Sequence, residues 1–320
     1  MKMLRPLAAS LILSLGVTAL THADPLDPRQ IPADAKWVIH ADMDAARDTK
    51  LWAAMDNELS TNADFQNGIG KIEQITGAQF PRDLHDVTLY GRSADDQAGV
   101  VIVHAHVNRQ QIVTLLQMNT AFASNAYGDY QVLTWHDDDK NKTMFGSFKD
   151  DSTMIISQTE DLVKGALDVM DDKAEHIKVD SPLAAGAKPQ LLAFIAASDL
   201  RRWKQADKAQ SPVVQQVENA WISLTETDGN AVVKANVVTK DADTAEQLNQ
   251  LLNGVKAMVA LSANSQDADT RAKAGEISSL LKTLSVKRDD KALTVEWTIA
   301  IEKGEEAFAM LTGKKAAANN

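Results

Sequence analysis

The stretch "VVIVHAHV", residues 100–107, decides the fold, because the stretch "NAVVKANV", residues 230–237, repeats its pattern later in the chain. In both stretches valine or alanine recurs at every second position. This alternation is typical of a β-strand, whose successive side chains point to opposite faces. A shift of one residue would move every side chain to the other face, so the shared register indicates two equivalent strands in two similar halves.

The elements expected around the first of these strands follow a recognisable order. A strand, a helical region, two strands, a helix and a fourth strand give the β-α-β-β-α-β order of a split βαβ, or ferredoxin-like, unit. A hairpin of two added strands and a closing helix complete this half. The expected strands are 37–43, 86–91, 100–107, 130–135, 144–148 and 154–157, and the expected helices lie within 51–75, 108–118 and 159–170.

The same kinds of element then recur. The expected order is a strand at 191–200, a helix within 203–217, a hairpin at 221–238, helices at 244–261 and 270–284, a hairpin at 284–301 and a helix at 304–313. The sequence therefore predicts an α+β protein of two similar halves, each a split βαβ sheet with added hairpin strands and a closing helix. The predicted segments are a first half at 24–172, a linker at 173–189, a second half at 190–313 and a disordered tail at 314–320.

The N-terminus has the pattern of a secretory signal peptide, predicted at residues 1–23. Lys2 and Arg5 precede an apolar run, and Ala23 offers a small residue for cleavage. The run is shorter than the roughly 20 residues that a membrane-spanning helix needs, and no other stretch approaches that length. We therefore expect a periplasmic or secreted protein with no membrane span after cleavage.

The composition limits the possible chemistries and partners. The chain has no cysteine, which excludes disulfides, thiolate metal sites and cysteine nucleophiles. Its net charge of −11 argues against nucleic acid as a partner. A protein or a small-molecule ligand remains, and the sequence leaves the oligomeric state open.

Two pairs of residues are candidates for a metal site: His40 with Asp42, and His104 with His106. Each pair shares one face of an expected strand, and in a split βαβ unit these two strands are neighbours. If both pairs point to a face that no helix covers, three imidazoles and a carboxylate could converge. Such ligands suit zinc, copper, nickel or iron.

A structural interpretation of the same residues competes with the metal site, and we favour it. Lys234 and Asn236 stand in the second half where His104 and His106 stand in the first. A polar face turned to solvent, opposite apolar residues that lie under the helices, explains both pairs. Asp42 also has an ordinary role, because it ends a strand just before a helix whose N-terminus it can cap.

The sequence predicts neither catalytic residues nor a cofactor-binding motif. The preferred hypothesis is an exported, non-enzymatic binding or interaction protein of the cell envelope, using its open sheet faces or a cleft between the halves. The alternative is a metal-dependent enzyme or metal carrier built on His40, His104 and His106. A third hypothesis is an envelope protein that pairs with itself.

Three stretches together resemble a group of exported bacterial proteins of unknown function. They are "IPADAKWVIHADMDAARDTKLW" at 31–52, "FPRDLHDVTLYG" at 80–91 and "YQVLTWHDD" at 130–138. The resemblance implies export and a two-part α+β build. It implies no activity and no site residues.

Overall fold

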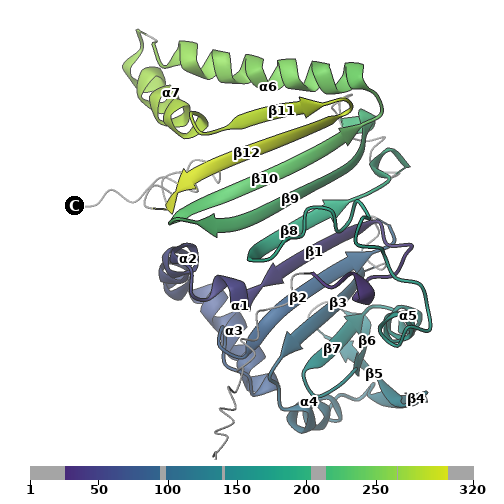
Figure 1. Cartoon of the computed structure of the whole chain (residues 1–320). Helices are drawn as coiled ribbons and strands as arrows, with labels where there is room; N and C mark the ends of the chain where they lie inside the picture. The colour runs from purple at the N-terminus through teal and green to yellow at the C-terminus, as the bar shows by residue number, and fades with distance from the viewer. Residues whose placement is uncertain (1–25, 94–98, 139–140, 203–213, 265, 302–320) are drawn as a thin grey trace, which may run out of the picture.

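The structure is a computed structural model that describes residues 26–93, 99–138, 141–202, 214–264 and 266–301. The predicted signal peptide at 1–23, the helix at 304–313 and the tail at 314–320 lie outside these residues. Figure 1 shows one twisted sheet that runs the length of the molecule, with helices packed against it and at its sides.

The described residues form twelve strands, seven α-helices and three short 3₁₀ helices. The strands are β1 (Trp37–Asp42), β2 (Leu84–Gly91), β3 (Gly99–Ala105), β4 (Ala123–Tyr127), β5 (Tyr130–Asp137), β6 (Lys142–Phe148), β7 (Thr153–Ser157), β8 (Leu191–Ala197), β9 (Val217–Thr227), β10 (Asn230–Thr239), β11 (Ser285–Asp289) and β12 (Ala292–Ala300). The helices are α1 (Met43–Ala46), α2 (Lys50–Thr61), α3 (Ala63–Thr76), α4 (Arg109–Leu116), α5 (Glu160–Met170), α6 (Ala242–Ser262) and α7 (Ala268–Leu281), with 3₁₀ turns η1 (Pro28–Gln30), η3 (Leu200–Arg202) and η5 (Val214–Gln216).

All twelve strands belong to a single sheet, in the order β11-β12-β10-β9-β8-β1-β2-β3-β7-β6-β5-β4. The first strand of each half, β1 and β8, pair with each other, which joins the two halves edge to edge. Outward from this junction the order is β1-β2-β3-β7-β6 on one side and β8-β9-β10-β12-β11 on the other. On each side of the junction, the five nearest strands therefore follow the same arrangement.

The α+β class is confirmed, but the expected split βαβ order is wrong. In such a unit the first and third strands would be neighbours, whereas here β2 separates β1 from β3. Both edges of β1 are already occupied, one by β2 and the other by β8. After α3 the chain returns antiparallel beside β1, so the helical connection ends next to the strand where it began.

One face of the sheet, which we call the core face, carries the main core. Val38, Tyr90 and Val100 lie side by side on β1, β2 and β3, and each is at most 1% exposed. Helix α5 and two irregular segments cover them, including the segment 173–189 that was predicted to be a linker. The covering residues are Leu26, Ile31 and Ala35 from the N-terminal segment, Val163, Ala166 and Leu167 from α5, and Ile177, Leu183 and Ala184 from the predicted linker.

Helices at both ends of the sheet cover its opposite face. On the first half α4 packs over β5 and β6 through a small cluster of Ile112, Leu133 and Phe148. On the second half α6 contacts β10, β11 and β12, and the indole of Trp297 donates a hydrogen bond to the carbonyl of Leu280 in α7. The middle of this face, over β1, β8 and β9, has exposed apolar side chains, among them Ile39, Ile195 and Ile222.

The close packing at Gly186 gives a test of this core. A Cβ at residue 186 would lie 2.4 Å from the Trp221 ring and 2.8 Å from that of Phe194. Gly186→Ala should therefore lower the free energy of unfolding by about 1–3 kcal/mol, measured by urea denaturation. Gly254→Ala is the matched control, because nothing lies within 4 Å of the Cβ it would add in α6. That variant should gain up to about 1 kcal/mol from helix propensity. An unchanged midpoint for Gly186→Ala would contradict the packing described.

Candidate functional site

The first pair of predicted site residues, His40 and Asp42, lies on the core face rather than on an open one. Both are 2% exposed, and they alternate along β1 with Ile39, which is 38% exposed. The expectation that the histidine face of β1 is uncovered is therefore wrong. The reason is that His40 and Asp42 share their face with Val38, which the irregular segments and α5 cover.

Only one of the two ring nitrogens of the buried His40 has a hydrogen-bond partner among the described residues. Its Nδ1 lies 2.8 Å from the hydroxyl of Thr88 on the adjacent strand β2. Its Nε2 is buried and has no hydrogen-bond partner among the described residues. A neutral imidazole with Nδ1 bonded to the hydroxyl fits this environment, because burial lowers the pKa of His40 below its usual value.

His104 lies on the same face, two strands away from β1. Its Nδ1 is 2.8 Å from Oδ1 of Asp86, and its Nε2 is 3.3 Å from the side-chain amide nitrogen of Gln30. Asp86 pairs across the sheet with both Asp42 and His104. Burial alone would lower the pKa of His104, but the hydrogen bond and negative charge of Asp86 outweigh it, and the pKa is raised.

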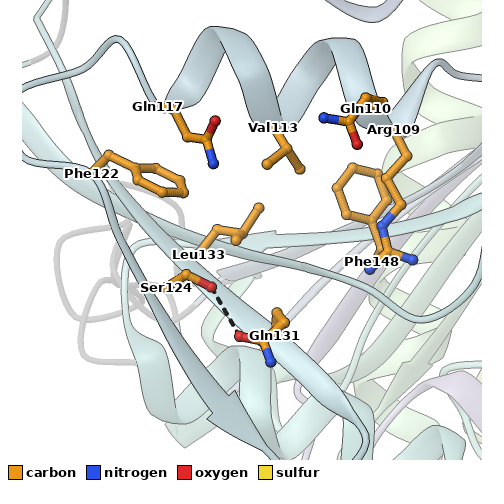
Figure 2. A pocket seen from close by; sticks show the side chains of 9 residues that line it. All are labelled: Arg109, Gln110, Val113, Gln117, Phe122, Ser124, Gln131, Leu133 and Phe148. Carbon is orange, nitrogen blue, oxygen red and sulfur yellow. Dashed lines mark hydrogen bonds between the residues drawn. The ribbon is translucent and has the colours of Figure 1, made fainter.

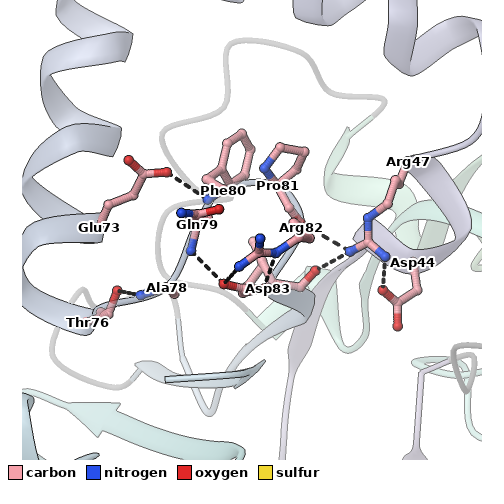
Figure 3. Close-up of polar contacts among 11 residues, drawn as sticks. Asp44, Arg47, Glu73, Thr76, Ala78, Gln79, Phe80, Pro81, Arg82 and Asp83 are labelled. Atoms are coloured by element: carbon pink, nitrogen blue, oxygen red, sulfur yellow. Dashed lines mark hydrogen bonds and ion pairs between the residues drawn. The ribbon is translucent and has the colours of Figure 1, made fainter. Parts of the chain in front are cut away.

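His106 belongs to a different group of side chains. It is exposed, and its ring meets the ring of His85 edge-on at 4.6 Å between centroids. His85 in turn bonds Asp44, with 2.8 Å between Nδ1 and Oδ2. Arg47 fixes the position of Asp44 (Figure 3): its guanidinium forms an ion pair with Asp44 and donates a hydrogen bond to the carbonyl of Pro81.

The structure therefore brings His40, Asp42 and His104 to one face and places His106 against His85 instead. Within the described part of the chain, no three histidine, cysteine, aspartate or glutamate side chains are grouped so as to hold a metal ion. Asp42 has the capping role that the sequence predicted, since its Oδ1 accepts a 2.7 Å hydrogen bond from the backbone N–H of Ala45.

A second candidate site is the exposed apolar area where the two halves meet. On the face opposite the core, three neighbouring strands present three rows of three side chains each, and every one is apolar. None of the nine counts as buried. We call this area the junction patch: Trp37, Ile39 and Ala41 of β1, Ala193, Ile195 and Ala197 of β8, and Ala220, Ile222 and Leu224 of β9.

The centre of the junction patch is its most exposed part. Ile39 pairs with Ile195, which pairs with Ile222, and their exposed fractions are 38%, 50% and 48%. The apolar row continues into the neighbouring strands through Leu89 on β2 and Ala235 on β10. The sequence predicted that Trp37, Ile39 and Ala41 share a face but placed that face under helices. The missed signal is that β8, "LLAFIAA", is apolar on both faces.

A third candidate is a pocket of about 420 Å³ between α4 and the strands β4, β5 and β6. Figure 2 shows that α4 contributes one wall and the strands the other. Apart from Arg109, every lining side chain is uncharged. The lining residues are Arg109, Gln110, Val113, Gln117, Phe122, Ser124, Gln131, Leu133 and Phe148.

The buried carboxyl of Asp42 predicts a defined pH dependence. Burial raises its pKa to about 6, and the nearby charges of Asp86 and Asp44 add to this. As pH falls from 8 to 4.5, the folded protein takes up a proton on Asp42 near pH 6, whereas the unfolded chain does so only near pH 4. Protonation therefore stabilises the fold as pH falls through this window.

The comparison that isolates this effect is with Asp42→Asn, which keeps a capping side chain but does not titrate. Relative to this variant, the wild type should gain about 2 kcal/mol between pH 8 and pH 4.5, measured by urea unfolding at each pH. The lowered pKa of His40 changes the free energy of unfolding with pH in the opposite direction. This change is the same in the wild type and in Asp42→Asn, so it cancels when the two are compared. A difference that is constant with pH would show that Asp42 has an ordinary pKa.

Comparison with known proteins shows no family by sequence. No family model matches the chain, and no curated protein matches it. Among solved structures, crystal form IV of TP0453 is 8% identical, with a TM-score of 0.49 over 90% of this chain and 98% of that one. Crystal forms III and I of TP0453 give TM-scores of 0.47 and 0.44 at 8% and 10% identity, each over 89% of this chain. Among the described residues, no helix has both the length and the apolar composition needed to cross a membrane.

Proposed function

We propose that this protein is an exported, non-enzymatic binding or interaction protein of the cell envelope, which docks an apolar surface of its partner onto the junction patch. The observation that carries the proposal is the exposure of Ile39, Ile195 and Ile222 at the centre of nine apolar side chains. Isolated exposed apolar residues are common, but a contiguous apolar area on a folded surface marks an interaction site.

The energetics of the patch favour binding over exposure to water. Covering the remaining exposed half of one isoleucine side chain contributes about 1 kcal/mol, and three such residues lie in one row. The three isoleucines lie side by side on neighbouring strands, so one partner surface can contact all three together.

The chemistry of the patch supports binding rather than catalysis. Its side chains are those of tryptophan, isoleucine, leucine and alanine, none of which donates or accepts a proton or acts as a nucleophile. Export rests on the signal-peptide pattern at 1–23. The matching strand order on the two sides of the junction supports an internal duplication that created the patch.

A neutral apolar fluorophore, N-phenyl-1-naphthylamine, tests the patch directly. The mature protein should bind the dye with increased fluorescence, and Ile195→Asp should weaken binding at least about fivefold by placing a charge at the centre. Val179→Asp is the matched control, since Val179 is 79% exposed but lies outside the patch. Met258→Asp separately reports dye bound to α6, where Met258 is 63% exposed. Equal binding by wild type and Ile195→Asp would refute the proposal.

Light scattering over a range of concentrations identifies one possible partner, a second copy of the chain. If two copies meet through the junction patch, the wild-type mass should double with concentration, while Ile195→Asp stays monomeric. If the wild type stays monomeric but binds the dye, the partner is another molecule.

A further inference from the structure

The pocket beside α4 has the composition of a small-molecule site and lies apart from the junction patch. Its apolar wall combines Val113 of α4 with Leu133 and Phe148 of the sheet, and Leu133 and Phe148 are both 6% exposed. Figure 2 shows the ring of Phe122 and the side chain of Gln117 near one end of the pocket and Arg109 near the other. Its volume of about 420 Å³ lies within the range of pockets that hold small ligands.

Arg109 gives one end of the pocket an unpaired positive charge. Its guanidinium lies over the ring of Phe148, with its central carbon 5.0 Å from the ring centroid. Within the described ranges, no carboxylate lies at ion-pair distance from Arg109. The other eight lining residues carry no charge. In a chain with a net charge of −11, a pocket whose lining holds one cation and no carboxylate favours an anion from solution.

The strand side of the pocket offers hydrogen-bonding groups. The hydroxyl of Ser124 donates to Oε1 of Gln131, which leaves the amide N–H groups of Gln131 available. Phe148 belongs to β6 and Ser124 to β4, two strands away, so the pocket spans about 10 Å across the sheet. A ligand that fits has an anionic group at one end, an apolar body and a length of about 10 Å.

We infer that this pocket binds a small organic carboxylate with an apolar or aromatic body. One planar guanidinium matches one carboxylate through two parallel hydrogen bonds, whereas the pocket has no second cation to balance the extra charge of a phosphate. Val113, Leu133 and Phe148 contact the body of the ligand. This site is independent of the junction patch and of the function proposed for it.

The probe for this site is 4-phenylbutanoate, compared with its uncharged analogue 4-phenylbutanamide. Binding is followed by NMR on mature protein with labelled methyl groups, because Val113 and Leu133 report the pocket and Ile195 reports the junction patch. The acid should shift the Val113 and Leu133 signals in a saturable way. The amide should bind at least about tenfold more weakly, because it lacks the charge-assisted hydrogen bonds to Arg109.

Two variants and one control assign the effect to the pocket. Arg109→Gln should weaken binding of the acid at least about tenfold. Gln117→Trp should abolish binding, because the larger side chain fills the pocket. The Arg109 and Gln117 side chains are both exposed, so neither substitution disturbs the core. Arg288→Gln removes an arginine that pairs with Glu246 in the second half, and it should leave binding unchanged.

Several outcomes would overturn the inference. The first is that the Val113 and Leu133 signals do not shift at any concentration of the acid up to its solubility limit. The second is that the acid and the amide bind equally well, and the third is that Arg109→Gln binds the acid as tightly as the wild type does. Each of these results would refute a carboxylate site in this pocket. Shifts confined to Ile195 would also overturn it, while supporting the proposed function of the junction patch. If the dye does not bind the junction patch but the acid still binds the pocket, the pocket inference stands and the function proposed for the patch is refuted.

Discussion

The antiparallel pairing of β1 with β8 is the contact on which the rest of the structure depends. Backbone pairing from Trp37 to Ala41 with Ala193 to Ala197 turns two sets of strands into one sheet. On one side of this seam Val38, Ala196 and Phe194 are buried in the main core. On the other side the same strands present the three isoleucines of the junction patch. The core and the candidate binding surface are thus opposite faces of one pair of strands.

The polar side chains on the core face are tolerated because most of their hydrogen-bonding groups are matched. His104 is held between Asp86 and Gln30, and Asp42 caps α1. His40 is the exception, with one ring nitrogen unpartnered among the described residues. Burial of such groups costs free energy unless hydrogen bonds replace those made with water. This arrangement explains a row of titratable residues in the interior without requiring a metal ion.

Local patterns in the sequence predicted much of the fold. The strand around His104, the hairpin that contains Lys234 and the cap at Asp42 all follow from alternation and capping preferences, and each is present. The strand order could not be predicted, because alternation specifies which side chains share a face but not which strand lies beside which. The edge pairing of β1 with β8 depends on contacts between residues about 160 positions apart, and no local pattern encodes it.

The candidate sites could likewise be predicted only as far as local sequence patterns reach. The alternation in β1 predicted that His40 and Asp42 share a face, and they do, but not which face the helices cover. Assigning the apolar positions to the covered side failed for Trp37, Ile39 and Ala41 of β1, because β8 beside them is apolar on both faces. The junction patch and the pocket beside α4 both arise from segments distant in sequence, so only the assembled sheet reveals them.

The seam between β1 and β8 also ties the two halves into one shared core. Five residues of β1 pair with β8, and Trp221 and Gly186 pack beside it on the core side. Separating the halves would leave two central strands with unpaired backbone groups and uncover Phe194 and Val38. A fragment containing either half alone would therefore carry an unpaired central strand at its edge, which is a template for pairing with another chain.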